Sequence, residues 1–295
     1  MEDIVKLRKL QILQLCILRK IDTICKKHNL QYYLIDGSML GAIRHKGFIP
    51  WDDDLDIAMP IEDMNKLRKI VQKDYADIFF YQSLETDKYY NALFDKIRLL
   101  GTKQLQKSVQ HLPLHCEIWI DIFPLYYSKT EKSIMLDFKE IVYKLLINCE
   151  DAKLGIIRSE KGLLRKATVF ISKMFSVFPK PFFDRISRIL LEKGKKFSDF
   201  VTSPFSAYGY KREMVPTSKY GSGKKVLFED IEVIVPNEPE YILSKIYGEY
   251  LKYPPLDERY VGHMLADISF GKYQNIVNEL YQGEKDGNRI SSIEL

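Results

Sequence analysis

DGSMLGAIRHKGFIPWDDDLDI, residues 36–57, is the stretch of sequence that decides the fold. The aromatic and aliphatic run at 32–35 precedes it and is typical of a buried strand that stops at the Gly-Ser step. Residues 40–43 can form a short helix, and residues 55–59 resume as a strand that Pro60 ends. The predicted order is therefore strand, Gly-Ser turn, helix and acidic strand.

Four carboxylates cluster in this stretch, and their spacing favours a metal site over a solvated turn. They are Asp52, Asp53, Asp54 and Asp56. Such groups repel one another unless a cation lies among them, and hard oxygen ligands suit Mg²⁺ or Mn²⁺. In a strand, residues two apart point to one face, so Asp54 and Asp56 converge and Asp52 extends that face. The aliphatic residues between them enter the core, for which a solvated acidic turn gives no reason.

A phosphate site and a third carboxylate complete the predicted arrangement. Gly37 and Ser38 lie between a strand and the first turn of a helix, where backbone N–H groups and a hydroxyl can approach a phosphate closely. Asp121 is the acidic residue of the apolar run 118–123, where a charge is costly unless it is paired with an Arg or bound to metal. We expect it to close a two-metal-type site. Together these features have the layout of a nucleotidyltransferase fold.

The remaining pattern predicts an α/β (α+β) protein, a nucleotidyltransferase-like mixed sheet with flanking helices and a helical insertion. Apolar residues recur at helical spacing over 7–24 and 61–74. A hairpin or edge strand at 228–235 and a helix at 239–250 are expected to follow. The predicted parts are a catalytic core at 1–130, a basic amphipathic helical insertion at 131–205, the C-terminal part of the core with the acceptor side at 206–282, and a polar tail at 283–295.

Composition and charge exclude several classes of protein. With 295 residues, of which 46% are hydrophobic and 29% charged, the chain is neither a disordered tail nor a fibrous protein. The net charge of +5 is modest, so nucleic acid is not an expected partner. The segment 151–200 is different, because it holds twelve Lys or Arg against five Asp or Glu. We interpret it as a solvated helical insertion or, alternatively, as a face that docks on an anionic membrane.

The expected location is the cytoplasm, with peripheral contact to the inner membrane face as an addition to it. The four cysteines are sparse and show no C-x-x-C spacing, as in a reducing compartment. The apolar stretch 10–18 is interrupted by Gln11 and Gln14 and is followed by no small-residue cleavage site, which argues against a signal peptide. No run approaches the roughly 18 apolar residues of a bilayer span.

The stretch 36–57 resembles the signature of the LicD family, the bacterial phosphocholine transferases related to fukutin-type ribitol-phosphate transferases. One departure is Tyr126, where the family often has an acidic residue. Further matching motifs are KIR at 96–98 with Gly101-Thr102, WIDIFPL at 119–125, YGEY at 247–250 and Pro254-Pro255. The resemblance therefore extends from about residue 32 to residue 255, apart from the basic segment.

The resemblance implies a CDP-activated donor, usually CDP-choline, whose phosphoalcohol moves to a glycan hydroxyl while CMP leaves. It implies a teichoic acid, lipopolysaccharide or capsule precursor as acceptor, commonly a lipid-linked one. Mg²⁺ or Mn²⁺ held by Asp54, Asp56 and Asp121 would neutralise the diphosphate. Asp52 is our choice for the group that accepts the proton of the attacking hydroxyl.

Other side chains are predicted to hold the phosphates, the alcohol and the acceptor. A quaternary ammonium is held best by aromatic faces, and Trp51, Trp119 and Tyr126 are the candidate rings, with ordinary core packing as the alternative. Arg259 and His263 are expected on the acceptor side. The candidate phosphate partners, each with a surface salt bridge as its alternative, are Arg44, Lys96 and Arg98.

Three other functions remain open on the sequence alone. The same carboxylates could serve a CDP-ribitol- or CDP-glycerol-type transferase. They could equally serve a nucleotidyltransferase that moves NMP from an NTP to a small hydroxylated substrate. A non-catalytic glycan or membrane adaptor is the non-enzyme alternative, although the complete carboxylate set argues against it.

Overall fold

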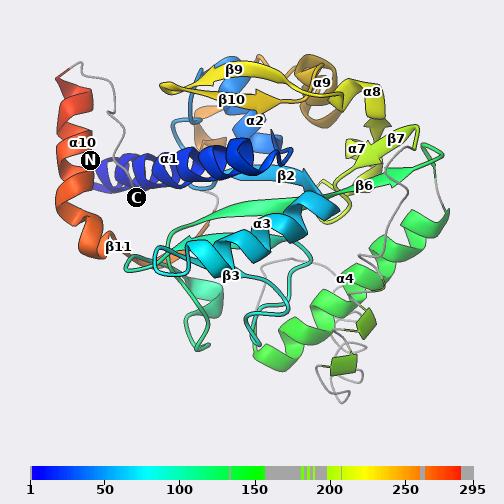
Figure 1. The fold of residues 1–295 in the computed structure, drawn as a ribbon, viewed down its shortest axis with the longest axis horizontal. Helices are drawn as coiled ribbons and strands as arrows, with labels where there is room; N and C mark the ends of the chain where they lie inside the picture. The colour runs from blue at the N-terminus through cyan, green and yellow to red at the C-terminus, as the bar shows by residue number, and fades with distance from the viewer. Residues whose placement is uncertain are drawn as a thin grey trace.

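We describe the fold from a computed structural model, in which helices flank a mixed β-sheet (Figure 1). The described residues are 2–132, 134–156, 181–182, 185–186, 189, 198–206, 208–259 and 263–286. Most of the basic segment 151–200 lies outside them, as does the end of the polar tail, so the amphipathic helices predicted there are not described. The architecture confirms the predicted α/β class.

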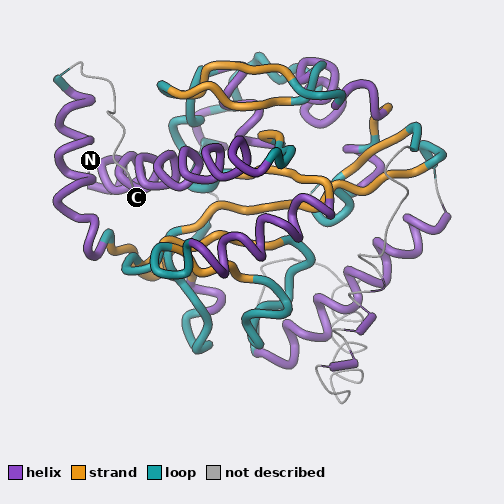
Figure 2. Tube along the Cα trace, viewed as in Figure 1, coloured by secondary structure: helices purple, strands orange, loops and turns teal. Residues whose placement is uncertain are grey.

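The strands of the main sheet lie side by side (Figure 2), and the acidic strand is the second in their order, between a short edge strand and the central strand. In sheet order the first five strands are β1 (Tyr33–Leu34), β2 (Asp56–Pro60), β6 (Trp119–Ser128), β4 (Asp95–Leu99) and β3 (Phe79–Gln82). β2 and β6 are parallel, whereas β1 and β4 pair with them in the antiparallel direction. The parallel register sets Asp56 opposite Asp121, so the two acidic strands that the sequence predicts lie side by side.

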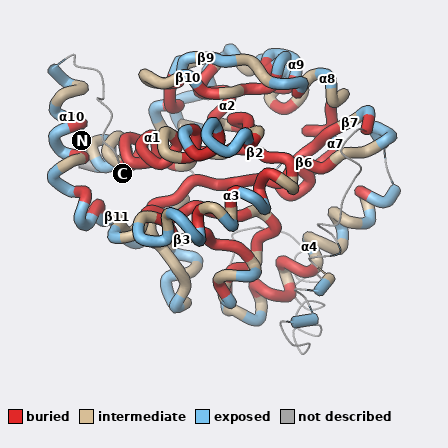
Figure 3. Tube along the Cα trace, viewed as in Figure 1, coloured by how far each residue is buried: buried red, intermediate tan, exposed pale blue. Residues whose placement is uncertain are grey.

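Helices cover this sheet with the apolar faces that the sequence predicts. α1 (Glu2–His28) contacts β6, and α3 (Ile61–Asp74) contacts β2, β3 and β6. The expected helix at 61–74 is confirmed to the residue, and the one at 7–24 is part of the longer α1. Figure 3 shows α1 buried along most of its length. Its buried side chains include Leu10, Leu13, Ile17, Ile21 and Ile24.

Strand β6 runs through Pro124, although a proline ordinarily interrupts the interior of a sheet. The pairing of β6 with β4 stops at Ile122, and pairing with β7 (Phe200–Thr202) begins only at Tyr126. Pro124 therefore lies where β6 has only β2 as a neighbour, and its missing N–H removes no bond to a second strand. Beyond it, β7 in turn pairs with β8 (Val215–Pro216).

Helix α2 (Asp36–Arg44) begins four residues earlier than the predicted helix at 40–43. The Gly-Ser step is therefore the first turn of the helix and not a turn that precedes it. Asp36 has a φ of 48°, a left-handed conformation that Asp tolerates better than most residues. This turn brings the chain sharply from β1 into α2 and aims the helix N-terminus at the acidic strand.

The C-terminal third returns to the core. The predicted hairpin is β9 (Lys224–Phe228) with β10 (Ile231–Val235), and α9 (Pro239–Tyr247) packs on α2. β11 (Leu265–Ser269) pairs with β5 (Lys103–Gln106), and α10 (Gln274–Lys285) packs on α1. The other described elements are α4 (Ile134–Leu154), α7 (Tyr210–Glu213), α8 (Thr217–Tyr220), η1 (Lys107–Val109), η2 (Leu256–Glu258) and η3 (Gly271–Tyr273). In the described parts of the chain, no helix has the length and apolarity of a bilayer span.

Candidate active site

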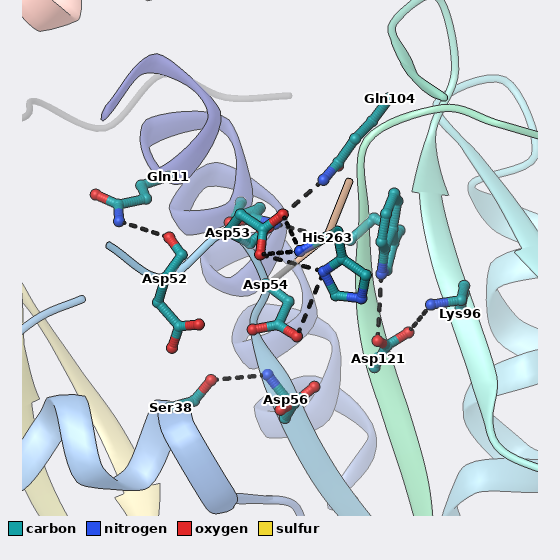
Figure 4. A network of polar contacts seen from close by, with 12 residues as sticks. Gln11, Ser38, Asp52, Asp53, Asp54, Asp56, Lys96, Gln104, Asp121 and His263 are labelled. Atoms are coloured by element: carbon teal, nitrogen blue, oxygen red, sulfur yellow. Dashed lines mark hydrogen bonds and ion pairs between the residues drawn. The ribbon is translucent and has the colours of Figure 1, made fainter. Parts of the chain in front are cut away.

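Five carboxylates gather where the loop before β2 meets the start of β2 and the adjacent part of β6. We call them the carboxylate cluster: Asp52, Asp53, Asp54, Asp56 and Asp121 (Figure 4). The aliphatic residues between them, Leu55 and Ile57, are fully buried, as the alternation predicts. Oxygen atoms of the three consecutive carboxylates 52–54 all lie within 4.8 Å of one another. Such spacing is that of a chelating group rather than of a dispersed acidic surface.

The metal ligands that the sequence predicts are Asp54, Asp56 and Asp121, whereas the three carboxylates that lie closest together are Asp52, Asp53 and Asp54. Asp56 and Asp121 are register partners on neighbouring strands, and Asp54 lies between Asp52 and Asp121 in Figure 4. Asp121, however, forms an ion pair with Lys96, and the Asp53 carboxylate is turned toward His263. Asp52, Asp54 and Asp56 have no cationic side chain closer than the 3.9 Å between Asp54 Oδ2 and His263 Nδ1 among the described residues.

Two glutamines of α1 hold the backbone of the acidic loop. Gln11 Nε2 donates to the carbonyl of Asp52 at 2.8 Å, and Gln14 Nε2 donates to that of Asp53 at 2.9 Å. Both side chains are buried in an otherwise apolar helix face. The sequence shows them only as interruptions of the apolar stretch 10–18. Buried amides that donate to loop carbonyls hold the backbone of the loop in place.

The first turn of α2 supports the cluster from the other side. Ser38 Oγ accepts a hydrogen bond of 2.8 Å from the backbone N–H of Asp56. The serine proposed for a phosphate thus anchors the start of β2. A Cβ atom at Gly37 would lie 2.9 Å from Asp52 Oδ2, so this carboxylate occupies the space that the glycine leaves. The positive end of the helix therefore faces the cluster directly.

Burial and mutual repulsion raise the pKa values of carboxylates in the cluster. Burial, followed by the charge of Asp54, raises the pKa of Asp52 and of Asp56 well above the ordinary value. Burial also raises the pKa of Asp54, although the charge of His263 opposes this. Burial and the charge of Asp54 raise the pKa of Asp36 to about 7. These shifts are those of anionic groups that lack a sufficient counter-charge.

Trp119 and Lys96 form one side of the cluster. Trp119 Nε1 donates to Asp121 Oδ2 at 3.2 Å, so the predicted common strand face of these two residues is confirmed. The ring is only 1% exposed, and Lys96 Nζ and Arg98 Cζ lie 4.4 and 5.1 Å from its centroid. Because cations of the protein already occupy this ring, Trp119 does not fit the expected role of a choline-binding surface.

Arg98 and Tyr126 do not meet the carboxylates. The Arg98 guanidinium is buried and donates to Gln82 Oε1 at 2.6 Å and to the carbonyl of Glu117 at 2.7 Å. Tyr126 is 5% exposed in a separate small core, where Lys139 lies over its ring. Five residues along a strand from Asp121 is about 16 Å. The substrate and phosphate roles expected for these two residues therefore do not fit the geometry.

His263 joins the cluster from the C-terminal third of the chain. Its Nδ1 lies 3.1 Å from Asp53 Oδ1, and its edge faces the ring of Trp119. Burial lowers the pKa of His263, but the hydrogen bond to Asp53 and the charges of Asp53 and Asp54 outweigh burial, so the pKa is raised. The sequence places His263 on the acceptor side but does not show its pairing with Asp53, which lies 210 positions away.

A second group of side chains forms an open rim beside the cluster. We call it the cationic rim: Arg44, His45, Trp51, Tyr253 and Arg259. The guanidinium carbons of the two arginines lie 4.9 and 5.3 Å from the Tyr253 centroid. Arg259 also lies 5.2 Å from the Trp51 centroid, and Trp51 directly precedes the acidic loop. The rim thus presents two positive charges next to the carboxylates.

Both rim arginines donate hydrogen bonds to backbone carbonyls. Arg44 Nη1 donates to the carbonyl of Tyr250 at 2.8 Å, and burial lowers the pKa of this guanidinium. Arg259 Nε donates to the carbonyl of Pro254 at 2.8 Å. Arg259 directly follows the 3₁₀ turn η2, and its own backbone angles, φ −92° and ψ 81°, are not helical.

The fold and the site define a class of α/β protein in which carboxylates meet at two parallel strands beside a helix N-terminus. The family model described as "LicD/FKTN/FKRP, nucleotidyltransferase domain" matches residues 29–143, which include the whole carboxylate cluster and α2. The part of the chain that carries the carboxylate cluster is therefore similar to the LicD family.

Individual relatives agree with this similarity. The chain is 24% identical over 263 residues to the lipopolysaccharide cholinephosphotransferase LicD of Haemophilus influenzae, across 88% of this chain and 96% of that protein. Shorter matches join it to two uncharacterized proteins of Rickettsia. Identity is 35% over 89 residues to RT0683 of Rickettsia typhi (24% of this chain, 28% of that one) and 49% over 45 residues to RP689 of Rickettsia prowazekii (15% and 17%).

Proposed function

We propose that this protein transfers phosphocholine from CDP-choline to a hydroxyl of a cell-surface glycan and releases CMP. The observation that carries the proposal is the pairing of Asp56 with Asp121 on parallel strands, next to Asp52 and Asp54, in a chain that is similar over most of its length to a lipopolysaccharide cholinephosphotransferase. Lipopolysaccharide is accordingly the first acceptor to test, and teichoic acid and capsule precursors are the next acceptors to test.

The donor set fits a divalent cation. Three carboxylates with raised pKa values, whose nearest cationic side chain among the described residues is His263 at 3.9 Å from Asp54, are what Mg²⁺ or Mn²⁺ would compensate. Asp54 and Asp56 would hold the ion, with Asp52 or Asp121 as the additional ligand. When bound, such an ion neutralises diphosphate oxygens and the charge that develops on the leaving group.

The side chains of the protein supply positioning and proton transfer. Asp52 lies within 4.8 Å of Asp54, and its raised pKa makes it a group that can accept the proton of the attacking hydroxyl. The N-terminus of α2 and the cationic rim attract the phosphate oxygens. The chain thereby aligns acceptor, phosphorus and CMP, which is most of what phosphoryl transfer requires of a protein.

Product analysis tests the proposal. The full-length protein with Mg²⁺ and a lipopolysaccharide acceptor is incubated with CDP-choline, CDP-ribitol, CDP-glycerol or an NTP, and CMP and pyrophosphate are quantified. The proposal predicts CMP with CDP-choline as the preferred donor. Pyrophosphate from an NTP would instead show a nucleotidyltransferase, and preference for another CDP-alcohol would reassign the donor. No turnover with any of them would favour the adaptor.

A membrane location is part of the proposal. Lipid-linked acceptors would be met at the inner membrane face, and the basic segment 151–200 is the part of the sequence with the charge to dock there. Co-sedimentation with liposomes should therefore rise with their content of anionic lipid. Co-sedimentation that is indifferent to this content would argue against membrane docking but leave the transfer reaction untouched.

A further inference from the structure

An arginine near the start of α1 joins three parts of the chain that are far apart in the sequence. Arg8 Nη1 and Nη2 donate to Glu229 Oε1 and Oε2 at 3.0 and 2.8 Å, a bidentate pair with the turn between β9 and β10. Arg8 Nε donates to Glu284 on α10 at 2.9 Å. The side chains of Arg8 and Glu229 are 19% and 18% exposed, so solvent ions screen their attraction only in part.

Glu229 holds the segment of chain that leads into the acidic loop. The Phe48 N–H donates to Glu229 Oε1 at 3.1 Å, and the Glu229 N–H donates to the carbonyl of Lys46 at 2.7 Å. A Cβ atom at Gly47 would lie 2.5 Å from Glu229 Oε1, so the carboxylate packs directly on the backbone there. Lys46 and Glu229 have φ angles of 62° and 56°, and such left-handed conformations persist only where surrounding contacts fix them.

Arg8 also sets the orientation of the Gln11 amide. Arg8 Nη1 donates to Gln11 Oε1 at 3.1 Å. A glutamine amide can turn over, which exchanges its donor and its acceptor end. Because arginine can only donate, it takes the oxygen and leaves Nε2 facing the carbonyls of Ile49 and Asp52, at 3.2 and 2.8 Å (Figure 4). The guanidinium that holds Glu229 therefore also fixes the donor that holds the acidic loop.

One ion pair thus reaches both ends of residues 46–52. Glu229 contacts the beginning of this segment, and Gln11 contacts its end at the Asp52 carbonyl. The Asp52 carboxylate in turn lies within 4.8 Å of that of Asp54. A shift of about 1 Å in the segment would therefore displace the proton acceptor relative to the carboxylates that would hold the metal, and a displacement of that size slows a reaction strongly.

We propose that Arg8 and Glu229 are positioning residues for the transfer reaction, an assignment that rests on the proposed function, which gives Asp52 its role. They touch none of the carboxylates of the cluster. They act through the Gln11 amide and through the backbone of residues 46–48, so the β9–β10 turn and α10 take part in holding the site. The sequence separates Arg8 from Glu229 by 221 positions, and no local pattern marks the pair.

A second ion pair at the same turn provides a matched control. Asp230 directly follows Glu229 and pairs with Arg19, which is also on α1. The side chains of Arg19 and Asp230 are 18% and 15% exposed, close to the values of the first pair. In the described structure, however, Asp230 makes no hydrogen bond to residues 46–54. Glu229→Leu and Asp230→Leu should therefore lower the urea midpoint by comparable amounts, whereas only Glu229→Leu should loosen the acidic loop.

Hydrogen exchange and initial rates of the full-length protein test the proposal. In Glu229→Leu, the amides of residues 46–54 should exchange about tenfold faster. Its kcat for CMP release from CDP-choline should fall about tenfold to a hundredfold, with the donor KM within about a factor of two. Glu229→Gln keeps an oxygen that accepts from Arg8 and Phe48, so its kcat should stay within about fivefold of the wild type. Asp230→Leu should leave kcat and the exchange of residues 46–54 unchanged.

Three results would count against the proposal in different ways. Equal effects of Glu229→Leu and Asp230→Leu on exchange and on kcat would overturn it, because the pair would then act only through stability. Should Glu229→Leu not fold, Gln11→Met decides, since it removes the link between Arg8 and Asp52, and an unchanged kcat would overturn the proposal. A wild type that releases no CMP from CDP-choline would overturn the proposed function, while the exchange rates would still decide whether the pair holds the loop.

Discussion

The carboxylate cluster and the cationic rim lie side by side but are held in opposite ways. Asp53 in the cluster is fully buried, and the loop around it is fixed by Gln11 and Gln14. Tyr253 in the rim is 47% exposed and is held mainly by its contacts with two arginines. The comparison indicates that the carboxylates are built into the core, whereas the rim lies on surface segments that can adapt.

Removal of one charge from the carboxylate cluster should have the largest effect on the rate of CMP release. Asp56→Asn takes away a metal-binding carboxylate, so CMP release from CDP-choline should fall by about a thousandfold. Because burial disfavours the charged form of Asp56, the unliganded variant should melt no lower than the wild type.

The exposed Asp267, which pairs with Lys103 on the surface, provides the control for this charge removal. Asp267→Asn should leave CMP release within about a factor of two, since surface ion pairs contribute little. Equal losses in the two variants would contradict the special role of the cluster.

A methyl group on α2 should disturb the cluster without disturbing the fold. In Gly37→Ala the added Cβ would displace the Asp52 carboxylate, and kcat should fall about a hundredfold, as expected for a misplacement of roughly 1 Å. The same change should raise helix stability by about 0.5–1 kcal/mol. Thermal unfolding and initial rates on one preparation check both parts. A loss of stability together with activity would show that the substitution acts through the fold.

The pH dependence of stability tests the uncompensated charge of Asp36. Its pKa of about 7 in the folded protein lies above the ordinary 3.8, so its ionisation destabilises the fold increasingly from pH 4 to pH 7. Relative to the wild type, Asp36→Asn should therefore be more stable by a few kcal/mol at pH 8 and equally stable near pH 4. Urea unfolding across this range measures the difference. Parallel curves for the two proteins would mean that Asp36 has a counter-charge.

The glutamines should matter for stability more than for chemistry. Gln14→Leu removes a donor to the carbonyls of Asp53 and Trp119 and leaves that of Asp53 with only the 3.5 Å bond from Gln104 Nε2, which should cost about 1–3 kcal/mol of unfolding free energy. The exposed Gln282 on α10 is the matched control, and Gln282→Leu should be neutral. Urea midpoints of the two variants provide the test. An unchanged midpoint for Gln14→Leu would show that the acidic loop is held by other contacts.

A substitution in the cationic rim is expected to have the smallest effect on activity. Arg259→Ala removes a half-buried positive charge over Trp51, so the donor KM should rise about threefold to tenfold at low salt, with kcat little changed. Added salt should shrink the difference, because it screens exposed charges. Initial rates at two ionic strengths measure this. A large fall in kcat that salt does not affect would place Arg259 among the reacting groups.

The sequence predicts the parts of this molecule that local pattern controls. The helix 61–74 follows from its apolar spacing, and the burial of Leu55 and Ile57 follows from strand alternation. Strand alternation also places Trp119 beside Asp121. It does not reveal that the cations of β4 already occupy the ring, because that depends on a neighbouring strand.

Long-range pairing explains what the sequence does not reveal. The contact between Asp53 and His263 depends on the return of the C-terminal third to the core, and no local signal marks it. Gln11 and Gln14 do have a signal, since two amides three residues apart on an apolar helix face require buried partners. The strand continues through Pro124 because neither β4 nor β7 pairs with it at that residue, which is a property of the sheet and not of the residue.

The dependence of CMP release on divalent cation tests the central claim most directly. Full-length wild type and Asp56→Asn are treated with EDTA, then titrated with Mg²⁺ or Mn²⁺ in the presence of CDP-choline and acceptor. The account predicts no CMP from the EDTA-treated wild type, recovery with either ion, and no recovery in the variant at the same concentrations. Release of CMP that is unaffected by EDTA, or equal in the two proteins, would contradict it.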